Sequence, residues 1–268
     1  MLRSFLYAVI GLSLIGGNTL FAHDTWVETH TNLIRTKGAI YVDLKLGNHG
    51  NEHRDFKQAS KIALDSCTLT VVDPDGQSYD LIDRVIDTGY TPTEGYWTGK
   101  FVAVKPGLYT VEHTLDKIVN HGRPMRSIKS AKTFFVASES LDRVPYDNPG
   151  FDRVVGHALE IVPVKNPVTP MGPGKSLKVR VLFKGEPLAD TRVSFIPAGT
   201  TLAEGFDEEY ERNTDAEGMA SFTPKSGNRY LVVVHQRSPE EKTADYDETI
   251  YSATLTIFVP EICPCCGE

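Results

Sequence analysis

The chain has 268 residues, with 28 basic and 35 acidic side chains and a formal net charge of −7. This acidic balance argues against binding to nucleic acid or to anionic membrane surfaces, because both need clustered basic residues. Four cysteines, Cys67 and three in the C-terminal "CPCC", are too few and too unevenly placed to form the disulfide framework of a large protein.

Residues 1–22 have the features of an export signal. Arg3 supplies a positive start, "FLYAVIGLSLI" is an apolar core too short to span a bilayer, and Leu20-Phe21-Ala22 is an acceptable exit after "GGN". We expect cleavage after Ala22, which makes His23 the first residue of an exported, periplasmic protein. An uncleaved N-terminal anchor is the alternative, but no long apolar continuation supports it. We expect no integral membrane segment in the mature chain.

Strand patterns dominate residues 23–162. "IYVDLKL" (40–46) alternates apolar and polar residues with the period of two that is typical of a half-buried strand. "CTLTVVDPDGQSYDL" (67–81) and "GKFVAVKPGLYTVEH" (99–113) each predict two strands joined by a turn. "HRDFKQASKIAL" (53–64) is the best candidate for a short helix, with a loop as the alternative. The pattern predicts an N-terminal β-sandwich.

A boundary is expected at residues 163–175, where four prolines and two glycines exclude a helix or a central strand. Strand patterns resume over residues 176–260 and predict a second sandwich, followed by a cysteine-rich tail at 261–268. Both halves place a glycine shortly before a tyrosine that opens an apolar strand, Tyr109 and Tyr230. This layout is that of a tyrosine corner, although ordinary strand aromatics remain the alternative. The predicted fold is all-β, with two tandem Ig-like antiparallel β-sandwiches, and the second half also resembles transthyretin-like modules.

His23 is the sharpest chemical candidate, because cleavage gives it a free amine beside its imidazole. The amine and Nδ1 form a chelating pair that suits Cu, Ni, Co and Zn better than Ca or Mg. One further imidazole would complete a site of the histidine-brace type. The alternative is a frayed terminus. Trp26 argues against fraying, since its ring can hold the segment against a sheet.

A second group of donors lies in "LGNHGNEHRDF", where His49 and His53 flank Glu52 in the order H-x-x-E-H. That protease pattern works only on a helix, and the surrounding glycines and asparagines are poor helix residues, so we reject it. A ligand loop with two imidazoles remains, with an ordinary solvated loop as the alternative. His113 ends the strand that contains Tyr109 and shares its face, which predicts either a third ligand or a buried structural histidine.

The other histidines have weaker claims. His121 lies in a predicted loop, and we interpret His30, His157 and His235 as structural.

The tail offers a possible second metal site or a disulfide, formed by Cys263, Cys265 and Cys266. Closely spaced thiolates bind soft or borderline ions. A bridge from Cys67 to one of the tail cysteines is the other reading for an oxidising compartment. A four-cysteine zinc site would need a second C-x-x-C, which the sequence lacks. Enzyme signatures are also absent, and we expect a non-catalytic protein.

The stretches "HDTWVE", "VGHALEIVPVKNP", "GPGKSLKVRVLFKGEPLADTRVSF", "GNRYLVVVH" and "YSATLTIFV" resemble a family of exported bacterial proteins of unknown function described as NikM-like. The resemblance covers essentially the whole mature chain. It implies a periplasmic component of nickel or cobalt uptake, with His23 as the mature-terminal histidine and "NHGNEHRD" as the place for further ligands. The "CPCC" tail is not part of the resemblance.

These observations predict an exported, non-catalytic protein that binds Ni, Co or a similar ion, with Cu or Zn also suited to the donors. It would present the ion to a membrane metal transporter. The alternatives are a periplasmic copper carrier with an N-terminal histidine brace, a copper oxidoreductase built on the same brace, and a non-metal Ig-like binding or adhesion module.

Overall fold

A computed structural model describes residues 23–47, 56, 58, 60–120 and 122–262. Within these residues the chain is almost entirely β, with one short 3₁₀ turn, η1 (Ile82–Arg84), and no α-helix. The described part has no helix that is long and apolar enough to span a bilayer. The strands are β1 (Asp24–Thr29), β2 (Leu33–Arg35), β3 (Ala39–Gly47), β4 (Cys67–Val72), β5 (Ser78–Asp80), β6 (Ile86–Asp87), β7 (Trp97–Val102), β8 (Gly107–Asn120), β9 (Pro124–Ser138), β10 (Leu159–Pro163), β11 (Leu177–Phe183), β12 (Glu186–Pro187), β13 (Arg192–Pro197), β14 (Glu211–Asn213), β15 (Met219–Phe222), β16 (Asn228–Ser238) and β17 (Thr249–Val259).

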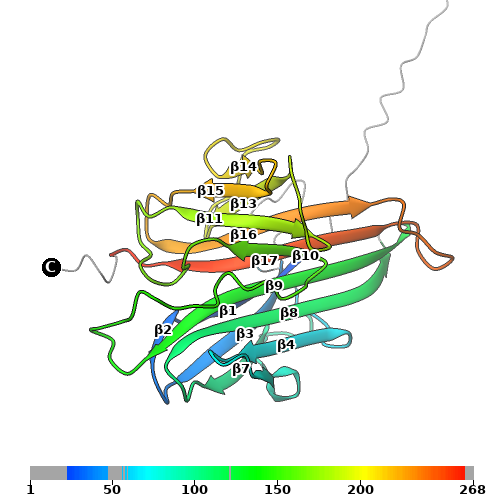
Figure 1. The fold of residues 1–268 in the computed structure, drawn as a ribbon. Helices are drawn as coiled ribbons and strands as arrows, with labels where there is room; N and C mark the ends of the chain where they lie inside the picture. Colours follow the sequence, from blue (N-terminus) through cyan, green and yellow to red (C-terminus); the bar gives the residue numbers. More distant parts are fainter. Residues whose placement is uncertain (1–22, 48–55, 57, 59, 121, 263–268) are drawn as a thin grey trace, which may run out of the picture.

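The strands form one large sheet and two small ones (Figure 1). The large sheet has nine strands in the order β14-β13-β16-β17-β9-β8-β4-β5, with β2 also paired to β9. One small sheet has the order β1-β3-β7-β6, and the other has the order β10-β11-β12 with β15 beside β11. Each small sheet closes a sandwich against part of the large one.

The two small sheets cover opposite faces of the large sheet. Side chains alternate along β9, so Phe134 and Phe135 point to opposite faces. Phe135 lies in the apolar core that contains Val42 of β3, whereas Phe134 lies in the core that contains Val179 of β11. The structure therefore confirms the predicted all-β fold of Ig-like antiparallel sandwiches.

The two sandwiches share the large sheet through a parallel pairing of β17 with β9. This pairing runs in register from Thr249 beside Arg126 to Thr256 beside Thr133. The first strand of the second sandwich, β10, precedes the segment 163–175 and pairs with β11. The proline-rich segment is thus a connection inside the second sandwich.

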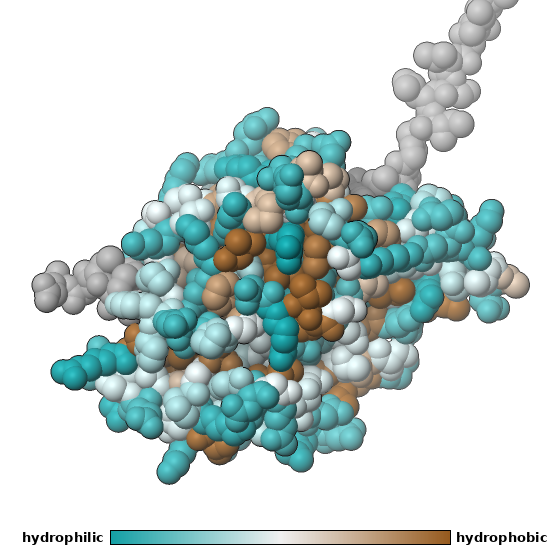
Figure 2. Space-filling view, viewed as in Figure 1, coloured by the Kyte–Doolittle hydropathy of each residue, from teal (hydrophilic) through white to brown (hydrophobic). Residues whose placement is uncertain are grey.

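On the face drawn in Figure 2, apolar residues gather near the middle, where Figure 1 places β9 and β10.

Both predicted tyrosine corners are present. The Tyr109 hydroxyl donates to the carbonyl oxygen of Lys105 at 3.0 Å, and the Tyr230 hydroxyl donates to that of Ser226 at 3.1 Å. Both rings are buried, so each phenol fastens the turn before its strand to a core. The helix considered for residues 53–64 falls partly outside the described residues, and its last five residues, 60–64, are not helical.

Candidate functional site

The site begins with β1, whose six residues are all buried. β1 pairs with β3 and also packs against β9 and β17 of the large sheet. The Thr254 hydroxyl of β17 donates to the Thr25 carbonyl oxygen at 2.8 Å. Both faces of the strand are therefore covered. The chain that follows His23 is fixed on the large sheet from its first strand residue onward.

Asp24 and His235 form a pair at the start of β1. The Asp24 side chain is fully buried, and the Nε2 atom of His235 lies 2.9 and 3.1 Å from its two carboxylate oxygens. His235 belongs to β16, and 28% of its side chain is exposed, so the pair connects the core to the surface. A buried carboxylate without a partner would cost several kcal/mol. The imidazole therefore stabilises the position of the strand start.

Two more polar side chains extend this pair across the sheet. His235, Ser252 and Lys129 are in register on β16, β17 and β9, so their side chains share a face. Together they line part of a cavity of about 10 Å³, which is room for one water. Burial lowers the pKa of Lys129 to about 8, although the negative charge of Asp24 acts in the opposite direction. The Ser252 hydroxyl has no hydrogen-bond partner within the described residues.

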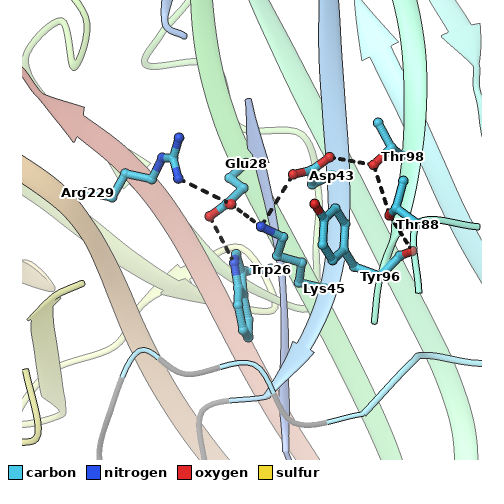
Figure 3. A network of polar contacts seen from close by, with 8 residues as sticks. All are labelled: Trp26, Glu28, Asp43, Lys45, Thr88, Tyr96, Thr98 and Arg229. Carbon is cyan, nitrogen blue, oxygen red and sulfur yellow. Dashed lines mark hydrogen bonds and ion pairs between the residues drawn. The ribbon is translucent and has the colours of Figure 1, made fainter. Parts of the chain in front are cut away.

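A second polar network fixes the middle and far end of β1 (Figure 3). The buried Glu28 carboxylate accepts a hydrogen bond from Trp26 Nε1 at 3.3 Å and forms ion pairs with Lys45 and with Arg229. The Trp26 ring is buried and meets Phe56 edge-on, with ring centroids 5.3 Å apart. The same ring packs in a buried cluster with Leu231 and Val233 of β16, which confirms the expectation that Trp26 holds this segment against a sheet.

The predicted donors of the first site fall in different places. His23 lies half-buried directly before β1. His49 and His53 lie outside the described residues, but the residues that flank their segment do not. Gly47 is the register partner of Asp24 and also forms a bridge with Gln58. The segment that carries both histidines therefore leaves and rejoins the described fold next to Asp24.

His113 lies in the core of the first sandwich. It is fully buried, and its Nδ1 atom lies 2.7 Å from the Thr68 carbonyl oxygen. Its Nε2 atom has no hydrogen-bond partner within the described residues. Burial lowers the pKa of the ring to about 4, so the imidazole is neutral at neutral pH. This geometry matches the structural alternative better than the ligand, because an ion would have to enter an apolar core.

Of the four cysteines, Cys67 lies within the described residues. Cys263, Cys265 and Cys266 lie outside the described residues. Cys67 forms no disulfide with any residue that the structure describes, and its thiol donates to the Ala63 carbonyl oxygen at 3.4 Å. Burial raises the pKa of this thiol to about 11, which keeps it protonated at neutral pH.

No group of three or more His, Cys, Asp or Glu side chains within the described ranges is arranged to hold a metal ion. Asp24 and His235 supply only two side-chain donors. The sequence analysis interpreted His235 as structural and did not anticipate its contact with Asp24. His235 is the first polar residue after the apolar run "LVVV". A polar residue at that position indicates only that a buried strand ends there. Nothing in the sequence links it to Asp24, which lies 211 residues earlier.

Comparison with solved structures gives only distant likenesses. Salmonella alpha-2-macroglobulin reacted with methylamine is 13% identical with a TM-score of 0.26, over 89% of this chain and 15% of that one. A DUF4785 family protein from Legionella pneumophila is 11% identical with a TM-score of 0.26, over 78% of this chain and 50% of that one. Fibronectin(III)-like modules of Clostridium thermocellum CbhA are 12% identical with a TM-score of 0.22, over 87% of this chain and 94% of theirs. The chain thus spans half or less of the length of the first two, and these scores support no functional argument.

Sequence comparison is more decisive. No curated protein matches the chain. The model of a family described as a domain of unknown function, DUF4198, matches residues 20–238. This match covers β1, the Asp24–His235 pair and most of both sandwiches. The chain therefore belongs to the DUF4198 family of domains of unknown function.

Proposed function

We propose that this protein is an exported, non-catalytic transition-metal-binding protein that captures Ni, Co or a similar ion at its mature N-terminus. Removal of residues 1–22 would leave the amine and Nδ1 of His23 as a chelate. The observation that carries the proposal is the fixed position of the next residue, Asp24, which is buried against His235. A ligand attached to a rigid strand loses less freedom on binding than one on a frayed terminus.

The surroundings suit such a site. The segment with His49 and His53 is flanked by Gly47 and Gln58, which meet beside Asp24. Amine, imidazole and carboxylate donors favour Ni, Co, Cu and Zn over Ca or Mg. His113 is left out of the proposed site because its side chain is buried in the first core.

The resemblance to NikM-like proteins supports a role in nickel or cobalt uptake, in which the periplasmic protein passes its ion to a membrane transporter. A copper carrier would use the same donors. Copper binds most nitrogen and oxygen sites more tightly than nickel or cobalt does, so affinity alone does not identify the natural ion. The metal that is present in protein isolated from the periplasm does identify it.

The first experiment is to purify the protein from the periplasm and to measure its intact mass and metal content. We expect a chain that starts at His23 and carries about one equivalent of a transition metal. The purified protein is then stripped of metal and titrated with Ni, Co, Cu and Zn. The His23→Ala variant should bind at least about tenfold more weakly, since it loses the imidazole half of the chelate. His30→Ala is the matched control, because His30 is exposed beyond the far end of β1.

A protein that starts elsewhere, or that binds every ion equally well with and without His23, would contradict this proposal. Retention of a protein or a glycan without any bound metal would instead favour the Ig-like binding module.

A further inference from the structure

The Asp24–His235 pair has the arrangement that proteins use to orient a metal-binding histidine. In such sites a carboxylate accepts the N–H of one ring nitrogen, which fixes the tautomer and leaves a lone pair on the other nitrogen for the metal. Here both carboxylate oxygens of Asp24 lie within 3.1 Å of Nε2 of His235. A proton on Nε2 makes Nδ1 the donor atom toward a metal.

The direction of β1 brings the mature terminus to the same place. Asp24 contacts His235, and four residues later Glu28 lies 3.4 Å from Arg229, so β1 runs antiparallel to β16 across this face. Going back from Asp24 to His23, the chain therefore continues past His235 toward the end of β16 at Ser238. The Cα atoms of His23 and Asp24 are about 3.8 Å apart, as in any trans peptide. The amine and imidazole of His23 are therefore carried by the residue that directly precedes Asp24 of the Asp24–His235 pair.

The neighbouring cavity is a second, independent indication of a ligand. It is lined by His235, by the buried Lys129 and by Ser252, whose buried hydroxyl lacks a hydrogen-bond partner within the described residues. Buried polar groups normally have a protein or water partner. The cavity has room for one water, which could also complete the coordination of an ion held at its edge.

We infer that His235 is a metal ligand through Nδ1 and that Asp24 is the positioning residue that orients it. The ion would then connect the first residue of the mature chain to β16 of the second sandwich. This inference rests on the proposed function and adds to it the side chain from the C-terminal half. Imidazole nitrogens with an amine suit Ni, Co, Cu and Zn. Zn(II) is the probe, because it is diamagnetic and shifts the signal of a ring nitrogen by direct binding.

The test uses the mature protein labelled with ¹⁵N-histidine and titrated with Zn(II). We expect the Nδ1 signal of His235 to shift with the first equivalent, while the ring signals of His30 stay unchanged. His235→Gln keeps a donor for Asp24 but removes the ligand nitrogen, and Asp24→Asn keeps the ligand but weakens its orientation. Loss of an orienting partner should lower the affinity about 10- to 100-fold, and loss of the ligand at least as much. His30→Gln is the control for both.

The outcomes separate the two proposals. If the wild-type protein binds no transition metal, the proposed function fails and this inference fails with it. If the wild type binds metal but the His235 signals stay in place and His235→Gln binds equally tightly, the function stands and the inference is overturned. If either variant fails to fold, the Nδ1 signal of His235 in the wild-type protein decides the question alone, because a diamagnetic ion shifts a ring nitrogen strongly only when it is bound to it.

Discussion

At the scale of single residues, burial decides the chemistry of each imidazole. His113 is fully buried, and among the described residues only its Nδ1 atom has a hydrogen-bond partner, the Thr68 carbonyl oxygen. Its pKa of about 4 reflects that burial, because a charged ring would lose its hydration. His235, in contrast, is part-exposed, and its Nε2 atom lies 2.9 Å from a carboxylate oxygen of Asp24.

His113 should make folding stability fall as the pH drops from 6.5 to about 4. The unfolded ring binds a proton near pH 6.5 and the folded ring only near pH 4, so the unfolded state holds more protons in this window. The difference corresponds to about 3 kcal/mol of stability, present above pH 6.5 and lost by pH 4. Urea unfolding of the wild type and of His113→Gln at pH 7 and pH 4.5 measures it. The variant should lose clearly less stability than the wild type.

An equal loss of stability in the wild type and in His113→Gln would show that His113 is not held neutral.

At the scale of elements, a buried ion pair ties β9 to β10. Lys132 and Glu160 are 2.7 Å apart, and both side chains are at most 2% exposed. Burial alone would raise the pKa of Glu160, but Lys132 and backbone N–H groups hold it below its usual value. The carboxylate accepts bonds from the amides of Val155, Gly156 and His157, so it also fixes the segment that leads into the second sandwich.

Glu160→Gln should destabilise the protein by about 3–5 kcal/mol, because it leaves the Lys132 ammonium buried without a counter-charge. The double variant Lys132→Met, Glu160→Gln removes both charges, keeps an amide oxygen as acceptor for the backbone N–H groups, and should recover part of that loss. Chemical denaturation of the three proteins at pH 7 gives the comparison. A single variant as stable as the wild type, or a double variant less stable than the single one, would rule out this role for the pair.

Local patterns predicted the strands and the turns, but they carried no information on long-range partners. The alternation in "IYVDLKL" and the glycine before Tyr109 or Tyr230 are local, and both led to correct predictions. In contrast, β17 is buried on both faces, so its sequence does not show which strand lies beside it. The contact between Asp24 and His235 was hidden for the same reason, since it is created only when β1 crosses β16.

At the scale of the whole molecule, the shared sheet makes the two sandwiches mutually dependent. The parallel pairing of β17 with β9 is an interior part of the nine-stranded sheet. The core of the second sandwich also contains Leu108, Phe134 and Val136 from the first half of the chain. Separation would expose two long strand edges and part of an apolar core.

We therefore expect the protein to unfold in one cooperative transition and its halves not to fold alone. The halves to express are residues 23–157 and 158–262, which divide the chain just before β10. Calorimetry of the intact protein should give equal calorimetric and van't Hoff enthalpies. Circular dichroism of each half should show no cooperative melting. A half that melts cooperatively near the temperature of the intact protein would mean that the sandwiches are independent domains.

The central claim is that a free amine at His23 builds the metal site, and one added residue tests it. An alanine placed before His23 removes the chelating amine and leaves every side chain unchanged. Calorimetric titration with Ni(II) and Co(II) should show about one ion bound by the chain that starts at His23, and an affinity at least about tenfold lower for the extended chain, because the amine nitrogen has become an amide. Equal affinities, or no binding by either chain, would contradict the account.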